Sequence, residues 1–326
     1  MQRFLLACLL ATALSLSLSL AIAAPDVTND SWLVLQKAAH AARELSYKGV
    51  FVYQSGSNSK SVQITHMNYG QGEYARLIVL DGSPREVLSQ GRDVVIFSPK
   101  NEKVVIEKRR GQNLFPALLP ANMDVIKGSY QVRMGGSERV GGREGQIIYL
   151  DPRDHFRYGY KFWADREYGL LLKSMTTNEQ NEPMEQITFN QLVLLNTQNL
   201  DWFQPTVDPD KSYVMQDAAS IASAPQEVDK WTIAQLPPGY RKIDQVMRTV
   251  PGKTAMSNHI IFSDGLASVS LFIEPLVKNS RPKTGHTAMG ATNFYASVTD
   301  GYQIMVVGEV PKATVAQIAN AVTFNK

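Results

Sequence analysis

"YKGVFVYQSGSNSKSVQITHMNYGQGEYARLIV", residues 47–79, contains three runs of β-branched and aromatic residues separated by the turn sequences GSNS and YGQG. Runs of this kind, interrupted by glycine and small polar residues, predict antiparallel strands joined by tight turns. The same pattern recurs further along the chain, in residues 84–89, 92–99, 102–109, 128–134, 145–151, 156–165, 169–177 and 184–195. The sequence therefore predicts a mainly β, antiparallel meander, large enough to curl into an open or closed barrel.

Two segments outside the meander predict helices. TNDSWLVLQKAAHAAREL (28–45) places apolar residues at helical spacing, and Asn29 or Asp30 is suited to cap it. ATVAQIANAVTF (313–324) does the same near the C-terminus. The first helix and a segment inside the meander that two prolines interrupt, residues 107–120 (the proline-broken segment), are expected to cover the mouth of the barrel.

The chain divides into segments of different composition. Residues 1–23 have a basic Arg3, an apolar run and the small-residue sequence AIA, which predict a Sec signal peptide cleaved after Ala23. Residues 24–205 form the predicted barrel domain, and 206–227, rich in proline and small polar residues, form a predicted linker. Residues 228–326 predict a small α+β domain with hairpin turns at 263–265 and at Asp300-Gly301.

Composition excludes several classes of function. The single cysteine, Cys8, lies in the predicted signal peptide, so the rest of the chain can form neither a disulfide nor a cysteine-based zinc site. The 33 basic and 30 acidic residues nearly balance, which argues against bulk attraction to nucleic acid. No metalloprotease, serine-hydrolase, P-loop or dinucleotide motif is present. The glycine-rich GGSERVGGREG (135–145) has strands on both sides, which favours hairpin turns over a phosphate loop. We therefore expect a binding protein without cofactor, metal or catalytic residues.

EKRRGQNLFPALLP (107–120) joins a basic cluster to an apolar one. One interpretation is a surface loop whose leucines fold back onto the barrel. The other is a lid over an apolar cavity, with cations at its rim, that binds an anionic amphiphile. The candidate lipid-binding residues are Lys103, Lys108, Arg109, Arg110, Leu114, Phe115, Leu118 and Leu119.

Five stretches carry a resemblance to a known family: LDGSPREVLSQG (80–91), RYGYKFWADREYGLLLKSM (157–175), LPPGY (236–240), FSDGLASVSLFIE (262–274) and VVGEVP (306–311). They resemble the RseB/MucB family of periplasmic regulators. The resemblance implies a first domain like LolA and LolB, with an unclosed barrel, followed by a smaller domain. It also implies binding to the periplasmic part of a transmembrane anti-sigma factor, RseA or MucA. That binding would shield the anti-sigma factor from the site-1 protease DegS until lipopolysaccharide releases it, and homodimers are expected.

The second domain is expected to supply part of the partner surface. Its strand SVSLFIEP (268–275) is a candidate for pairing with an extended peptide, and plain core is the alternative for the same alternation. The linker from Pro205 to Pro225 is a candidate hinge. The candidate partner-binding residues are Trp231, Tyr240, Val269, Leu271 and Ile273. A periplasmic lipid or lipoprotein carrier of the LolA type is the second hypothesis, and an unrecognised hydrolase is a third with least support.

Overall fold

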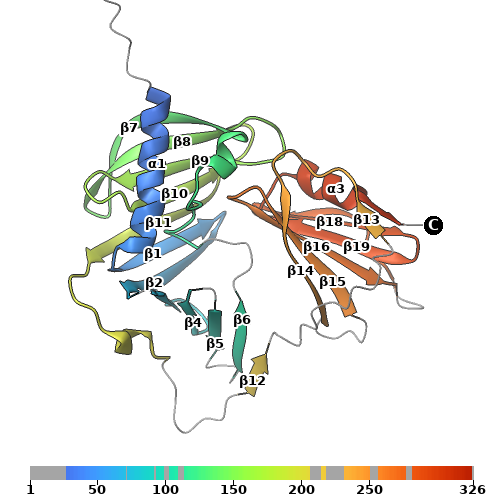
Figure 1. Ribbon diagram of the computed structural model, residues 1–326, viewed down its shortest axis with the longest axis horizontal. Coiled ribbons are helices and arrows are strands. Elements are labelled where there is room, and N and C mark those ends of the chain that lie inside the picture. The colour runs from blue at the N-terminus through green and yellow to red at the C-terminus, as the bar shows by residue number, and fades with distance from the viewer. Residues whose placement is uncertain are drawn as a thin grey trace, which may run out of the picture.

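The fold consists of two β units packed side by side (Figure 1). A computed structural model describes residues 27–70, 72–91, 93–98, 103–108, 114–205, 214–217, 231–249, 256–276 and 281–324. The predicted signal peptide, residues 1–23, lies outside these ranges.

The first unit is built on a twelve-stranded sheet with the order β12-β6-β5-β4-β3-β2-β1-β11-β10-β9-β8-β7. Its strands are β1 Tyr47–Ser55, β2 Asn58–Tyr69, β3 Gly72–Val79, β4 Arg85–Gln90, β5 Asp93–Ser98, β6 Lys103–Lys108, β7 Tyr130–Val140, β8 Arg143–Pro152, β9 Gly159–Asp165, β10 Leu171–Thr177, β11 Pro183–Leu194 and β12 Val214–Asp217. In the part of the chain that the structure describes, β12 and β7 end the sheet without pairing to each other. The predicted mainly β fold with an unclosed antiparallel sheet is confirmed.

A long helix, a short helix and the described part of the proline-broken segment, residues 114–120, cover one face of this sheet. Helix α1 (Val27–Glu44) runs across the strands and lies close to β7 and β9 (Figure 1). It begins at Val27, so the expected cap residues Asn29 and Asp30 stand in its first turn, where the carboxylate of Asp30 favours the helix dipole. Residues 114–123 and helix α2 (Asp124–Lys127) pack into the same core as α1.

An aromatic cluster joins the proline-broken segment to the sheet. The ring of Phe115 is 5.2 Å from that of Phe51 and 5.0 Å from that of Phe189, between ring centroids. All three side chains are buried. These ring contacts stabilise the segment on the sheet beyond the area that they bury.

Close packing in the same region restricts Gly49 on β1. A Cβ there would lie 2.5 Å from the carbonyl oxygen of Gln191 and 2.7 Å from Cε1 of Phe189. We expect Gly49→Ala to lower the free energy of unfolding by about 1–3 kcal/mol, because the strand pair must separate to admit a methyl group. Gly136→Ala is the control, since nothing lies within 4 Å of the added Cβ. Urea denaturation measures both, and equal stability of the two variants would contradict the prediction.

The second unit is a six-stranded antiparallel sheet with the order β14-β15-β16-β19-β18-β17. Its elements are β13 Trp231–Ile233, β14 Arg241–Thr249, β15 Met256–Ser263, β16 Ser268–Pro275, β17 Gly285–Met289, β18 Thr292–Thr299, β19 Tyr302–Gly308, α3 Lys312–Asn320 and β20 Val322–Phe324. Helix α3 buries Val315 and Ile318 against one face of the sheet. The predicted helix over 313–324 is therefore too long: residues 322–324 pair with β13 instead, a pairing that helical periodicity does not reveal.

Two predicted hairpin turns are present. Asp300 and Gly301, between β18 and β19, both have positive φ, 50° and 78°. Gly141 and Gly142, between β7 and β8, have φ of 56° and 83°. Positive φ at both central residues is the requirement of a type I′ hairpin turn. The glycine-rich segment 135–145 thus belongs to a hairpin, as predicted.

The region expected to be a linker contains a strand. β12 (Val214–Asp217) pairs in parallel with β6 and extends the first sheet. Within 206–227, only these four residues are described. The sequence-based interpretation did not predict this strand, because four residues are too few for a periodic signal and β6 lies 111 residues earlier in the chain. The candidate hinge between Pro205 and Pro225 lies mostly outside the described residues.

Candidate functional site

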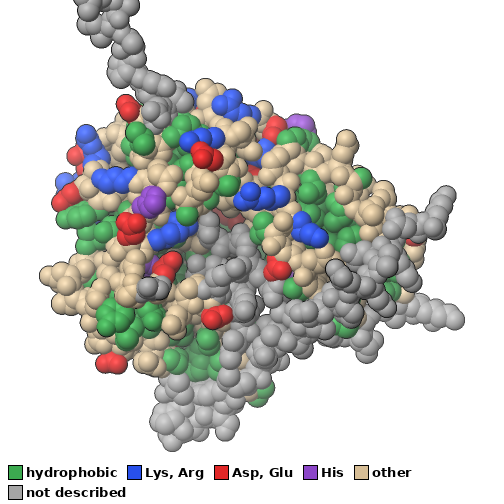
Figure 2. All heavy atoms as spheres, viewed as in Figure 1, with side chains coloured by type: hydrophobic (Ala, Val, Ile, Leu, Met, Phe, Trp, Pro, Cys, Tyr) green, Lys and Arg blue, Asp and Glu red, His purple; other side chains and the backbone are tan. Residues whose placement is uncertain are grey.

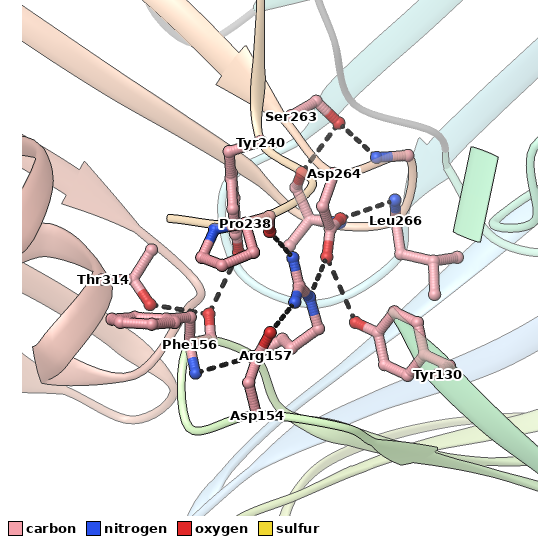
Figure 3. A network of polar contacts seen from close by, with 12 residues as sticks. Tyr130, Asp154, Phe156, Arg157, Pro238, Tyr240, Ser263, Asp264, Leu266 and Thr314 are labelled. Atoms are coloured by element: carbon pink, nitrogen blue, oxygen red, sulfur yellow. Dashed lines mark hydrogen bonds and ion pairs between the residues drawn. The ribbon is translucent and has the colours of Figure 1, made fainter. Parts of the chain in front are cut away.

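A buried ion pair joins the two units (Figure 3). Arg157, just before β9, donates from Nε to Oδ2 of Asp264 at 3.0 Å, and Asp264 lies in the β15–β16 turn. The side chains are 1% and 0% exposed, respectively. The guanidinium also donates to the carboxylate of Asp154 and to the carbonyl of Pro238. Each charge of the pair is thus compensated by several partners, as a buried ion pair requires.

Further hydrogen bonds complete the carboxylate's environment. Oδ1 of Asp264 accepts from the backbone N–H of Leu266 and of Ala267, both at 2.9 Å. Tyr130 donates its hydroxyl to Oδ2 at 3.3 Å. Burial, followed by the charge of Asp264, raises the pKa of Tyr130 well above its ordinary value, so the hydroxyl remains a donor.

Three more contacts extend this interface. The carbonyl of Phe156 accepts from the hydroxyl of Thr314 at 2.6 Å and from that of Tyr240 at 3.2 Å. Asn293 on β18 donates to the hydroxyl of Tyr158 at 3.0 Å. The loop 154–158 of the first unit is therefore held by four separate segments of the second. Such an interface has a defined geometry, unlike a contact that depends on a linker alone.

A cavity of ≈ 240 Å³ lies where the two units face each other. The sheet of the first unit, the proline-broken segment and the turns of the second unit all contribute to its wall. The lining residues are Tyr53, Leu114, Phe115, Leu118, Tyr160, Phe162, Ser174, Thr176, Glu185, Gln186, Ile187, Leu266, Ala267, Ser268, Ala291 and Glu309. An apolar wall with a few polar groups is the usual composition of a ligand-binding site.

The charged residues in this lining are both acidic. Glu185 on β11 accepts a hydrogen bond from the hydroxyl of Ser55 at 3.2 Å. Burial, and then the negative charge of Glu185, raise the pKa of Glu309. Burial and a hydrogen bond to Glu185 raise the pKa of Tyr53 as well. The cavity is therefore an environment in which a cation would be stabilised.

The predicted lipid-binding residues are divided by the structure. Leu114, Phe115 and Leu118 line the cavity, which agrees with a lid, whereas Leu119 is 1% exposed and belongs to the core. Lys103 and Lys108 are the ends of β6, but their side chains, like Arg109 and Arg110 as a whole, lie outside what the structure describes. Lipid binding by this set stays a prediction.

The predicted partner-binding residues are in the core of the second unit. Trp231, Tyr240, Val269, Leu271 and Ile273 are all at most 8% exposed. The hypothesis that the strand 268–275 offers a free edge is wrong, because β16 pairs with β15 on one side and β19 on the other. Alternation of apolar and polar residues is the same in central and edge strands, so it does not reveal the position of a strand in the sheet. Contact of these five residues with a partner is untested.

The Arg157–Asp264 pair was missed by the sequence-based interpretation. Both residues lie in stretches that carry the family resemblance, 157–175 and 262–274. The only local signal was that the largely aromatic run HFRYGYKFW, at residues 155–163, contains the basic residues Arg157 and Lys161. A charge in such a run marks a partner somewhere in the fold but does not identify it.

Surface charge, helix hydropathy and acidic or histidine clusters do not indicate a further type of site in the described residues. Basic and acidic side chains are interspersed on the face in Figure 2, which agrees with the near balance of charge. In the described ranges, no helix combines the length and apolarity needed to span a bilayer. Over the same residues, no three His, Cys, Asp or Glu side chains are grouped as metal ligands would be.

Comparisons with known proteins cover almost the whole chain. Models of the MucB/RseB N-terminal domain and the MucB/RseB C-terminal domain match residues 30–207 and 225–323. The sigma-E factor regulatory protein RseB of Haemophilus influenzae is 28% identical over 314 residues, 96% of this chain and 97% of the relative. The sigma factor AlgU regulatory protein MucB of Pseudomonas aeruginosa is 29% identical over 296 residues, 87% and 88% of the two chains.

Solved structures are similar over the same extent. The crystal structure of MucB in complex with MucA(peri) superposes with a TM-score of 0.71 and 26% identity, covering 91% of this chain and 100% of that one. The complex structure of Pseudomonas aeruginosa MucA/MucB has a TM-score of 0.72 and 27% identity, with 91% and 99% covered.

Proposed function

The chain belongs to the MucB/RseB family, and we propose that it is a periplasmic regulatory protein that binds the periplasmic part of an anti-sigma factor of the RseA/MucA type. Binding shields the anti-sigma factor from site-1 proteolysis and so keeps the extracytoplasmic sigma factor inactive. Lipopolysaccharide releases the regulator from the anti-sigma factor. The observation that carries the proposal is the similarity, across both units, to MucB in a complex with MucA(peri). This function needs binding surfaces and no reaction or cofactor.

The cavity suits a switch between two ligands. Its wall includes Leu114 and Leu118 from the proline-broken segment and Leu266, Ala291 and Glu309 from the second unit. A ligand in the cavity therefore touches both units. If lipid and partner favour different arrangements of this wall, each lowers the affinity of the other by the same factor, about 5- to 150-fold for a coupling of about 1–3 kcal/mol.

The alternative function is a lipid or lipoprotein carrier. The apolar wall and the leucines over the cavity favour it. A carrier that works through its first unit alone has no use for residues such as Leu266 and Glu309 in the wall. The two functions differ in whether the anti-sigma segment binds at all.

Calorimetric titration of the protein with the periplasmic segment of a MucA-type anti-sigma factor tests the proposal. We expect the segment to bind, and its affinity to fall by about 5- to 150-fold when lipopolysaccharide is present. Binding of lipid together with no binding of the segment would contradict the regulator and support the carrier. Light scattering during size exclusion checks the expected homodimer in the same samples.

A further inference from the structure

The two edges of the second sheet differ in chemistry. Edge strand β14 carries the charged residues Arg241, Lys242, Asp244 and Arg248, and its pairing with β15 has a bulge between Lys242 and Asp244. Charges and bulges are devices that keep an edge from pairing with another chain. Edge strand β17, GHTAM, has no Lys, Arg, Asp or Glu, no proline and no bulge in its pairing with β18. All five of its residues are exposed.

The β17–β18 turn determines which backbone groups point outward. Gly290 has φ of +60° at the first of two turn residues, which fits a type II′ hairpin closed by the pair Met289 and Thr292. Hydrogen-bonded and non-hydrogen-bonded pairs then alternate along the hairpin. His286 and Ala288 are in non-hydrogen-bonded pairs, so their N–H and C=O groups point away from β18. Among the strands that the structure describes, none pairs with this side of β17.

The end of β17 lies at the cavity. A Cβ on Gly290 would be 2.8 Å from Oγ of Ser55 and 3.5 Å from Oε1 of Glu185, and the next residue, Ala291, lines the cavity. A chain that pairs with β17 and continues past Met289 therefore reaches Glu185. Glu309 is in the same wall.

Building on the proposed function, we propose that the partner segment pairs in extended conformation with the outer edge of β17 and places a lysine or arginine side chain beside Glu185 and Glu309. The strand pairing gives affinity through the backbone, whatever the side chains, and the cavity gives selectivity. Charge complementarity selects a basic side chain, since the two carboxylates repel an anionic group and a cation relieves their mutual repulsion. Leu114 and Leu118 then contact the apolar neighbours of that side chain.

Ala288→Pro tests the strand pairing. Proline removes the outward N–H of residue 288 and places its ring on the outer edge, while the pairing with β18 is kept because this N–H does not serve it. We expect the affinity for the MucA-type periplasmic segment to fall at least about tenfold, from one lost backbone hydrogen bond and the obstructed edge. Ala288→Val is the matched control, with an intact N–H and a good strand former, and should bind like the wild type. Thermal unfolding verifies that both variants fold.

The doubly substituted Glu185→Gln, Glu309→Gln variant tests the charge. Each amide keeps the shape and an accepting oxygen, and Glu179→Gln, at an exposed acid outside the cavity wall, is the control. We expect the double variant to bind the segment at least about fivefold more weakly, and a segment whose basic residues are changed to alanine to show no such difference.

The outcomes separate the two proposals. If the wild type binds the segment and Ala288→Pro binds it equally well, the pairing at β17 is refuted. If the glutamine variant binds as tightly as the wild type, the basic contact is refuted. If the wild type does not bind the segment at all, the proposed function is refuted, and the pairing at β17 is refuted with it.

Discussion

Arg157→Ala is expected to lower the free energy of unfolding by about 3–5 kcal/mol, because it leaves the carboxylate of Asp264 buried without its cation. Asp264 is 0% exposed, so water cannot replace the lost partner. Urea denaturation followed by tryptophan fluorescence measures the change. Arg166→Ala is the control: Arg166 pairs with Glu144 at 2.7 Å, but both side chains are more than half exposed, and such pairs contribute about 0–1 kcal/mol.

A second variant separates charge from shape. Arg157→Met combined with Asp264→Asn removes both charges and keeps an oxygen that accepts from the backbone N–H groups of Leu266 and Ala267, so it should recover part of the stability lost in Arg157→Ala. Stability of Arg157→Ala within about 1 kcal/mol of the wild type would mean that the buried pair does not hold the interface.

The size of this effect bears on how a switch works. A full separation of the two units exposes the Arg157–Asp264 pair to water, which solvates both charges, and breaks the hydrogen bonds that Thr314, Tyr240 and Asn293 form with the loop 154–158. At about 0.5–1.5 kcal/mol for each hydrogen bond, the loss is at least as large as the typical coupling between two ligands, about 1–3 kcal/mol. We therefore expect the ligands to rearrange the residues that line the cavity while the buried pair stays intact. We do not expect them to separate the two units.

Phe115→Ala is the second change with a large expected effect, a loss of about 3–5 kcal/mol in the free energy of unfolding. The ring is 3% exposed and contacts Phe51 and Phe189, so its removal leaves a cavity between the proline-broken segment and the sheet. Leu114→Ala, one residue away and 38% exposed, is the matched control and should cost less than about 1 kcal/mol.

The same pair of variants separates packing from ligand contact. Phe115→Leu keeps most of the buried volume and should cost less than Phe115→Ala. Leu114→Ala should weaken ligand binding in the calorimetric titration without changing stability, because Leu114 lines the cavity and is partly exposed. Equal stability of Phe115→Ala and Leu114→Ala in urea would contradict the packed position of Phe115.

The sequence alone determined most strands of the first unit, the hairpin turns and the helix over 28–45. These features depend on contacts among near neighbours: alternation along a strand, φ > 0 at Asp300-Gly301 and at Gly141-Gly142, and helical spacing in 28–45. It left two interpretations of Leu114 and Phe115 open, a loop folded back onto the barrel and a lid over an apolar cavity, and the structure places both residues in the wall of the cavity.

Only the tertiary structure decided which strands have neighbours and which charges meet. β16 is central although its alternation would also suit an edge strand, β12 of the expected linker pairs with β6, and Arg157 contacts Asp264, 107 positions away. The two carboxylates of the cavity, Glu185 and Glu309, come together in the same way. Such pairings are set by the packing of segments that are distant in the sequence. The local sequence pattern around a strand or a charge is the same whichever distant segment it contacts, so the pattern does not identify the partner.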